Sequence, residues 1–464
     1  MPSAADVPLA LKRVWFRSRR AAVLLLLASL PAAASLAADL GYGFGSYLSY
    51  ESNINRTEVN PSRELTAAFF AGLSYSETAG DVTGRIYTYF ERRQFTQQTN
   101  QDDNRLFLEA NGTWSIMPKR FVWIFEDTFQ QVLLNLTAPS TPSNQAKTNS
   151  LSTGPELIIP MSSVNSFVTG ARYGRFDIEN STSDNVRYRG YGRIVHTNPA
   201  HSRFSLNYEA SRVFFEPGNP FQVVDRQDAF VSYQTLSADE GVYAGDSVSA
   251  DIGKSRVIQH AGDFRNALDG HLARVRLSKA ISPHFAVNAG YSDRISDTYS
   301  DMIAGIAGSQ VPMEGGVVIV QGGALATIDY YHVRRADMGF TAHGGDIEYT
   351  FQPYARTVDF QTLDQDYSET GGSFFWRWSF SGATRWQAFV SSSVRKYDSL
   401  ERRDADRIFG MSLDFKLNRT LRLGFAAGQT QRQSTAIGAS YVDQRFLVLL
   451  GYSSNYQLRT VITN

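Results

Sequence analysis

Hydrophobic and polar residues alternate along most of the chain with a period of two. In one short stretch Met411, Leu413 and Phe415 alternate with Ser412 and Asp414, and the same pattern resumes after a polar break. Successive side chains of a β-strand point to opposite faces. The stretch therefore predicts two strands, each with one apolar and one polar face.

Segments of this kind follow one another from Leu40 onward, separated by turn residues. Clear examples are residues 203–211, 272–279, 374–380 and 445–452, the last of which is apolar on both faces. Counting the segments predicts about 20 strands, with about 18 as the alternative. The pair of strands that decides between 20 and 18 lies around residues 234–253.

The predicted connections alternate between short and long. The short ones are residues 117–119, 198–201, 281–284, 344–346, 381–384 and 418–420. The longer, more polar ones include residues 135–149, 177–185, 216–225 and 397–406. Short periplasmic turns and long extracellular loops are typical of outer-membrane barrels.

The predicted fold is therefore an all-β, transmembrane, antiparallel β-barrel in the outer membrane of a Gram-negative bacterium. Aromatic residues near the segment ends, such as Tyr50, Trp114 and Tyr452, suit the two membrane interfaces. The apolar face would contact outer-membrane lipid and the polar face a water-filled lumen. An even strand number would place both termini in the periplasm. The alternative is a secreted all-β repeat protein.

The first residues follow a different pattern. A basic stretch precedes the apolar run 21–30, and small residues follow it. These features predict a cleaved secretory signal peptide over residues 1–37, with one barrel domain over 38–464. No later run is long enough for a membrane-spanning helix.

Composition removes several classes of function. The chain has no cysteine, and loss of residues 1–37 would leave a net charge near −4, which does not favour nucleic-acid binding. The seven histidines form no catalytic or metal-binding spacing, and no glycine-rich phosphate loop precedes a helix. We therefore predict neither enzyme activity nor a cofactor or metal, and expect a monomer.

Arginine is the clearest chemical signal, since only seven of the 45 basic residues are lysine. The candidate lumen-lining residues are Arg85, Tyr87, Arg93, Arg187, Arg189, Arg193, Arg274, Arg276, Arg335 and Arg377. Guanidinium groups bind carboxylates and phosphates and stack on aromatic rings. They could guide an anionic polymer or sugar, or pair with lumen carboxylates and hold the interior together. The pattern leaves both interpretations open.

One long apolar segment, residues 301–329, differs from the other predicted loops. It is rich in glycine and contains the run "VVIVQ". It could fold inward as a constriction or gate, or it could form a further strand that extends a hairpin above the membrane.

The chain also resembles a known family. The element "YESNINR" (50–56) in the opening strand and the late hairpin 409–434 are similar to β-barrel porins associated with exopolysaccharide synthesis loci, the EpsL type. The resemblance implies export of exopolysaccharide across the outer membrane, with periplasmic polysaccharide-export proteins as partners. The alternative is a general or solute-specific diffusion porin whose lumen carries other polar solutes.

Overall fold

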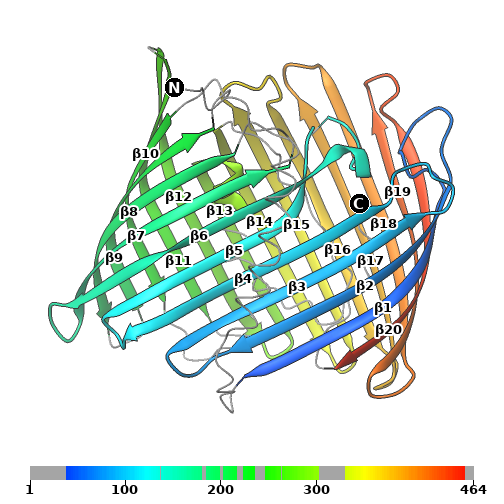
Figure 1. Cartoon of the computed structure of the whole chain (residues 1–464), viewed down its shortest axis with the longest axis horizontal. Helices are drawn as coiled ribbons and strands as arrows, with labels where there is room; N and C mark the ends of the chain where they lie inside the picture. Colours follow the sequence, from blue (N-terminus) through cyan, green and yellow to red (C-terminus); the bar gives the residue numbers. More distant parts are fainter. Residues whose placement is uncertain are drawn as a thin grey trace, which may run out of the picture.

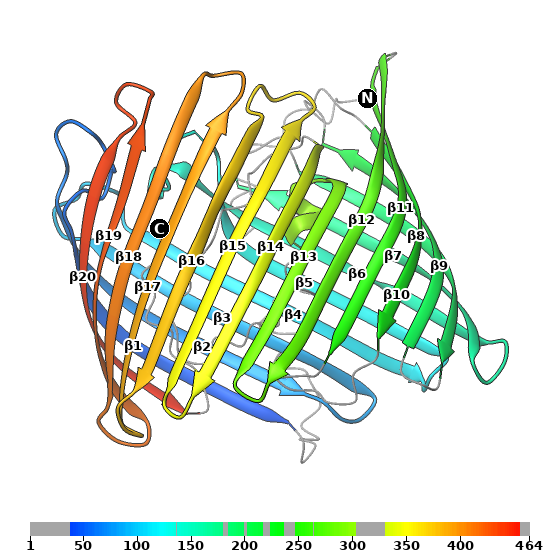
Figure 2. The same ribbon diagram turned by 180° about the vertical axis from the view of Figure 1, so that it is seen from behind.

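Twenty antiparallel strands follow one another along the chain and close into a barrel (Figures 1 and 2). This computed structural model describes residues 38–135, 137–179, 184–198, 202–216, 223–235, 246–262, 264–302 and 330–454. The twenty strands are counted in those residues, and they confirm the predicted all-β barrel. The predicted signal peptide, residues 1–37, lies outside the described residues and stays a prediction.

The strand boundaries place the predicted alternating segments inside strands. The strands are β1 (Asp39–Glu51), β2 (Glu64–Glu77), β3 (Val82–Phe95), β4 (Asp103–Met117), β5 (Phe121–Leu133), β6 (Gln145–Pro160), β7 (Asn165–Ile178), β8 (Asn185–Asn198), β9 (Ser202–Phe215), β10 (Val223–Thr235), β11 (Ser247–Ala261), β12 (Phe264–Ser282), β13 (Phe285–Ser296), β14 (Tyr331–Gly344), β15 (Ile347–Phe360), β16 (Tyr367–Ser379), β17 (Thr384–Tyr397), β18 (Arg402–Lys416), β19 (Leu421–Ser434) and β20 (Tyr441–Ser454). A single 3-10 turn, η1 (Pro142–Asn144), precedes β6.

The first and last strands pair and complete the ring. Their antiparallel register runs from Gly43 opposite Ser453 to Glu51 opposite Arg445. Every strand therefore has a hydrogen-bonded neighbour on both sides, and the sheet has no free edge. Closure matters in lipid, because no water is present there to satisfy unpaired backbone groups.

The outer face of the barrel is apolar. On β1, Tyr42, Phe44 and Leu48 are exposed, and comparable outward residues occur on every strand through to Phe446 and Val448 on β20. An exposed apolar band around a closed barrel is the surface that a bilayer covers. The protein is thus a transmembrane barrel of the outer-membrane type.

Helices play almost no part in the fold. No helix of the described residues is long and apolar enough to cross a membrane.

The inner face is mostly polar but carries apolar patches, one of which lies where the barrel closes. Tyr47 of β1 and Phe70 of β2 pack there with Leu447 and Leu449 of β20. Leu447 and Leu449 face this inner patch, while the residues that alternate with them contact lipid. The segment 445–452 is therefore apolar on both faces.

The connections follow the predicted alternation with exceptions. Those after odd-numbered strands are generally longer, but β11 and β12 are joined by residues 262–263 alone, and the other end carries residues 236–246. The expected long loop at 397–406 is wrong, because β17 continues to Tyr397 and β18 begins at Arg402. Of the charged residues that made 397–406 look like a loop, Arg402, Asp404 and Asp406 face inward and form ion pairs there, whereas Arg403 faces outward.

A glycine allows one inward aromatic ring to lie flat on the neighbouring strand. Gly410 of β18 is directly opposite Phe389 of β17. A Cβ atom at position 410 would lie 2.1 Å from Cε1 of Phe389, which is itself buried. The ring therefore fills the space that the missing side chain leaves.

We expect Gly410→Ala to lower the free energy of unfolding by about 1–3 kcal/mol, because Phe389 must leave its position. The measurement is urea unfolding of the refolded barrel in detergent, followed by tryptophan fluorescence. Gly382→Ala is the matched control, since nothing lies within 4 Å of a Cβ placed there. Equal stabilities for the two variants would contradict the packing argument.

Candidate functional site

All ten candidate residues lie on the lumen side of their strands. The register is continuous around the barrel, for example from Arg85 to Tyr87 on β3 and from Arg187 to Arg193 on β8. The period-two pattern was sufficient to assign these faces, because a strand has only two. Whether the residues take part in transport stays a prediction.

Eight of the nine candidate arginines pair with a carboxylate in the described residues. The pairs are Arg85–Glu109, Arg93–Glu91, Arg187–Asp297, Arg189–Glu209, Arg193–Glu156, Arg274–Asp251, Arg335–Asp337 and Arg377–Glu348. Arg276 is exposed and forms no ion pair with another described residue. The ion pairs hold most guanidinium groups at fixed positions on the wall.

The paired arginines differ in exposure. The side chains of Arg85, Arg189, Arg193, Arg274 and Arg335 remain between 40% and 48% exposed. Arg93, Arg187 and Arg377 are largely buried. The first group, on β3, β8, β12 and β14, can still contact a solute in the lumen, whereas the second group holds the interior together.

The most concentrated arginine site surrounds Tyr191 on β8. The guanidinium carbons of Arg172, Arg189 and Arg193 lie 5.3, 5.6 and 4.9 Å from the centre of its ring. The Tyr191 hydroxyl donates to Glu156 Oε2 at 2.7 Å, and Arg193 Nη2 donates to the same oxygen at 2.6 Å. Cations over an aromatic face are stabilised by the ring quadrupole, so the three positive charges can lie close together.

A hairpin narrows the lumen at the long-loop end. The β4–β5 pairing stops at Leu108 opposite Phe129, although β4 extends to Asp103 and β5 to Leu133. Beyond this point the ends of β5 and β6, with residues 134–144 between them, leave the wall. We call residues 130–148 the inward hairpin.

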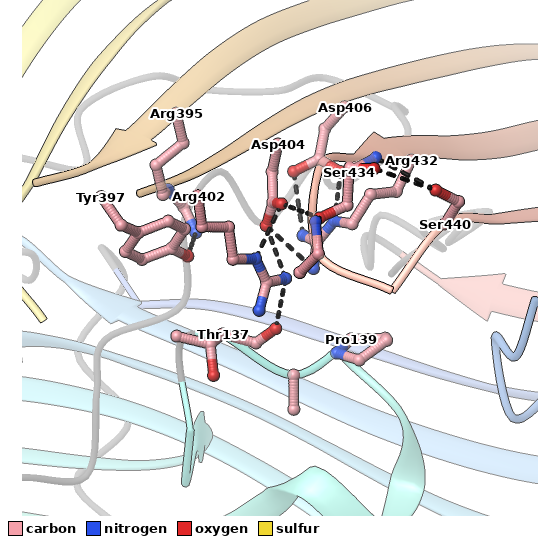
Figure 3. Close-up of polar contacts among 12 residues, drawn as sticks. Thr137, Pro139, Arg395, Tyr397, Arg402, Asp404, Asp406, Arg432, Ser434 and Ser440 are labelled. Atoms are coloured by element: carbon pink, nitrogen blue, oxygen red, sulfur yellow. Dashed lines mark hydrogen bonds and ion pairs between the residues drawn. The ribbon is translucent and has the colours of Figure 1, made fainter. Parts of the chain in front are cut away.

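The tip of the inward hairpin reaches the opposite wall (Figures 1 and 3). Arg402 of β18 donates from Nη2 to the backbone oxygen of Thr137 at 2.7 Å, while the same guanidinium pairs with Asp404. Arg56, in the β1–β2 connection, donates from Nη1 to the backbone oxygen of Ser140 at 2.9 Å. The tip therefore spans the lumen and is held by two arginines.

A small cavity lies against the tip. Its volume is about 20 Å³, which has room for about one water molecule. Its lining includes four arginines, Arg56, Arg93, Arg105 and Arg445, together with Glu51 and the tip residues Ser140–Pro142.

A second segment enters the lumen beside the hairpin. Residues 298–302, directly after β13, form a short helical turn. Arg187 Nη1 lies 3.0 Å from Asp297 Oδ1, and its guanidinium carbon lies 4.2 Å from the centre of the Tyr299 ring. Met302 Sδ lies 3.7 Å from Thr148 Oγ1 of the inward hairpin. The two inward segments therefore support each other.

The Arg187 contact also fixes the charge of Asp297. Burial alone would raise the pKa of Asp297, but the adjacent Arg187 guanidinium outweighs it and holds the pKa below the ordinary value. Asp297 therefore stays ionised at neutral pH, and its ion pair anchors the start of the long connection to β14.

Two of the predicted loops are the segments 301–329 and 135–149. Most of residues 301–329 lie outside the described residues, so the choice between a gate and a strand stays open. Residues 135–149 were expected to form an external loop, which is wrong, because they belong to the inward hairpin and β6 begins at Gln145. One signal was present, since residues 134–146 contain no charged side chain, unlike the segments 177–185 and 397–406.

Residues for metal binding do not come together in the described part of the chain. No group of three or more histidine, aspartate or glutamate side chains is placed to hold a metal ion there. The interior offers fixed arginines, tyrosines and carboxylates, which suit binding and passage of polar solutes.

Comparison with known proteins gives similarity of structure only. No family model matches the chain, and no curated protein matches it. Similar solved structures include the siderophore receptor PirA from Pseudomonas aeruginosa (10% identity, TM-score 0.44, covering 89% of this chain and 80% of that chain). The copper transporter OprC has 12% identity and a TM-score of 0.45, covering 90% and 80%. OccK2 (OpdF) from Pseudomonas aeruginosa has 9% identity and a TM-score of 0.38, covering 90% and 97%.

These likenesses concern barrel architecture alone. Nothing in them points to an exopolysaccharide locus. The closed barrel and its charged, polar lumen are those of an outer-membrane pore or transport protein in general terms.

We expect the double variant Arg189→Gln, Arg193→Gln to shift ion selectivity away from anions, because Glu209 then loses its cation and Glu156 keeps only Arg172. The measurement is the reversal potential across a planar bilayer under a KCl gradient. Arg212→Gln is the control, because Arg212 is paired with Asp225 on the outer face. A reversal potential that does not differ from that of the wild type would exclude these two arginines from the conducting path.

Proposed function

We propose that the barrel is an outer-membrane pore for the export of exopolysaccharide, and that the polymer carries acidic groups. One observation carries this proposal: lumen arginines on four strands are exposed yet fixed in place by carboxylates. They are Arg85, Arg189, Arg193, Arg274 and Arg335.

Arginines that are fixed and partly neutralised favour the passage of a polymer through the lumen over its tight binding there. A guanidinium group has five N–H donors, so pairing with one carboxylate leaves donors free for another oxygen. Each contact with a passing carboxylate or hydroxyl would be weak, since the nearby Asp or Glu offsets the charge. Conduction requires binding that permits entry and also release.

The narrowed lumen suits an extended chain rather than a folded cargo. The inward hairpin and residues 298–302 occupy part of the lumen at the long-loop end, where Arg402 holds the tip. A polymer would move through one repeat unit at a time. It would pass beside these segments or displace them. We further propose that periplasmic polysaccharide-export proteins deliver it at the short-turn end, and that one chain forms one pore.

The choice of exopolysaccharide rests on the sequence resemblance to EpsL-type porins, and the lumen chemistry is compatible with it. The second candidate is a general or solute-specific diffusion porin. It is favoured by the pairing of eight of the nine candidate arginines, which leaves little net charge to select one class of solute.

We expect deletion of the gene in the source bacterium to abolish polysaccharide at the cell surface and to leave it in the periplasm. Both pools are measured as hexose and uronic acid after cell fractionation, and uptake of small sugars is measured in parallel. Complementation with the wild-type gene should restore export.

The same experiment separates the two candidates. Normal surface polysaccharide together with slower uptake of one class of small solute would contradict export and support the porin. An unchanged result in both assays would contradict both.

A further inference from the structure

Three basic side chains project outward from β17 and β18 and form no ion pair with a described residue. Lys396, Arg403 and Arg407 are all exposed. Among the described residues none of them forms an ion pair, and the two acids of the adjoining turn, Asp398 and Glu401, do not pair with them either. The cluster of these three residues is called the outer cation cluster below.

The strand register places two of these charges face to face. Lys396 is directly opposite Arg403 in the β17–β18 pairing, and Arg407 lies opposite Ser392. Side chains directly opposite each other in antiparallel strands have Cβ atoms about 5 Å apart, and like charges in such pairs are destabilising. An anion bound between Lys396 and Arg403 would attract both and offset their repulsion.

Four outward arginines on other strands are arranged differently. Arg92, Arg212, Arg256 and Arg334 pair with Asp102, Asp225, Asp269 and Asp359 respectively. Their charges are satisfied within the protein. The outer cation cluster differs from these four, because two of its charges face each other and none of its members has a carboxylate partner in the described part of the chain. This arrangement suits an anion from outside the chain.

The position of the cluster identifies the environment of that partner. On β18 the outward residues Phe409 and Met411 are exposed and belong to the apolar band, as does Val390 on β17. Arg407 is the next outward residue of β18 beyond Phe409, about 7 Å along the strand. The cluster thus lies directly beyond the apolar band, at the level of lipid head groups on the long-loop side.

We propose that the outer cation cluster binds the phosphate groups of a phosphorylated glycolipid in the outer leaflet. Arginine binds phosphate oxygens through two parallel N–H bonds, and lysine contributes a point charge. Basic residues beside a membrane surface attract anionic head groups in the same way. The ligand would fix this wall of the barrel in the membrane, whatever the lumen transports.

The test compares two triple variants of the full-length barrel. Lys396→Gln, Arg403→Gln, Arg407→Gln removes the outer cation cluster. The matched control, Arg212→Gln, Arg256→Gln, Arg334→Gln, removes three outward arginines that already have carboxylate partners. Each protein is purified in detergent and titrated with bisphosphorylated lipid A, with its dephosphorylated form, and with inorganic phosphate, while the thermal unfolding midpoint is followed.

We expect bisphosphorylated lipid A to raise the midpoint of the wild type and of the control variant. Half-saturation should need at least about tenfold more lipid in the cluster variant. Equal affinity in the two triple variants would overturn the proposal, and so would an equal response to dephosphorylated lipid. An equal rise of the midpoint with inorganic phosphate at the same concentration would show that the cluster binds free phosphate and not the lipid.

One further variant keeps the test valid if the cluster variant does not fold. Arg403→Gln alone removes one of the two facing charges. It should raise the midpoint without lipid, because the repulsion with Lys396 is lost, and reduce the response to phosphorylated lipid. An unchanged midpoint without lipid would contradict the repulsion argument.

Discussion

The pairing of β1 with β20 is the interaction on which the rest of the structure depends. Nine residue pairs join these strands, although they lie at opposite ends of the described chain. In lipid an unpaired backbone N–H or C=O costs several kcal/mol, so an open edge could not persist there. Closure also gives every strand one lipid face and one lumen face, and this division decides where each side chain can act.

Inside the barrel, ion-pair networks take the place of an apolar core. Glu369 on β16 is one example, because it accepts hydrogen bonds from Arg356, Arg395 and the Tyr354 hydroxyl. Buried charges are costly unless they are paired and hydrogen-bonded. Such networks fix the wall, and only the more exposed arginines remain for a solute.

The sequence was sufficient for the faces of the strands but not for contacts between distant strands. Alternation with a period of two assigned Arg189 and Arg193 to the lumen. Their surroundings depend on register as well, because Glu156 on β6 bonds both Tyr191 and Arg193 on β8. Gly170, on the strand between them, leaves room for the Tyr191 ring. Spacing within one strand does not contain that information.

The inward hairpin was missed for a related reason. Its tip is uncharged and rich in Ser, Thr, Pro and Asn, which is also the composition of an exposed loop. The difference arises only where β5 stops pairing with β4 and Arg402 meets the tip from the opposite wall.

The central claim is that the lumen is the conducting path and that the inward hairpin narrows it. The most direct measurement is single-channel conductance in a planar bilayer for the wild type and for a variant in which residues 137–142 are replaced by Gly-Gly. If the claim holds, the shortened variant should conduct about twofold more than the wild type, because a narrow segment dominates the resistance of a pore. An unchanged conductance, with the variant shown to be folded by its heat-dependent mobility on a gel, would contradict it.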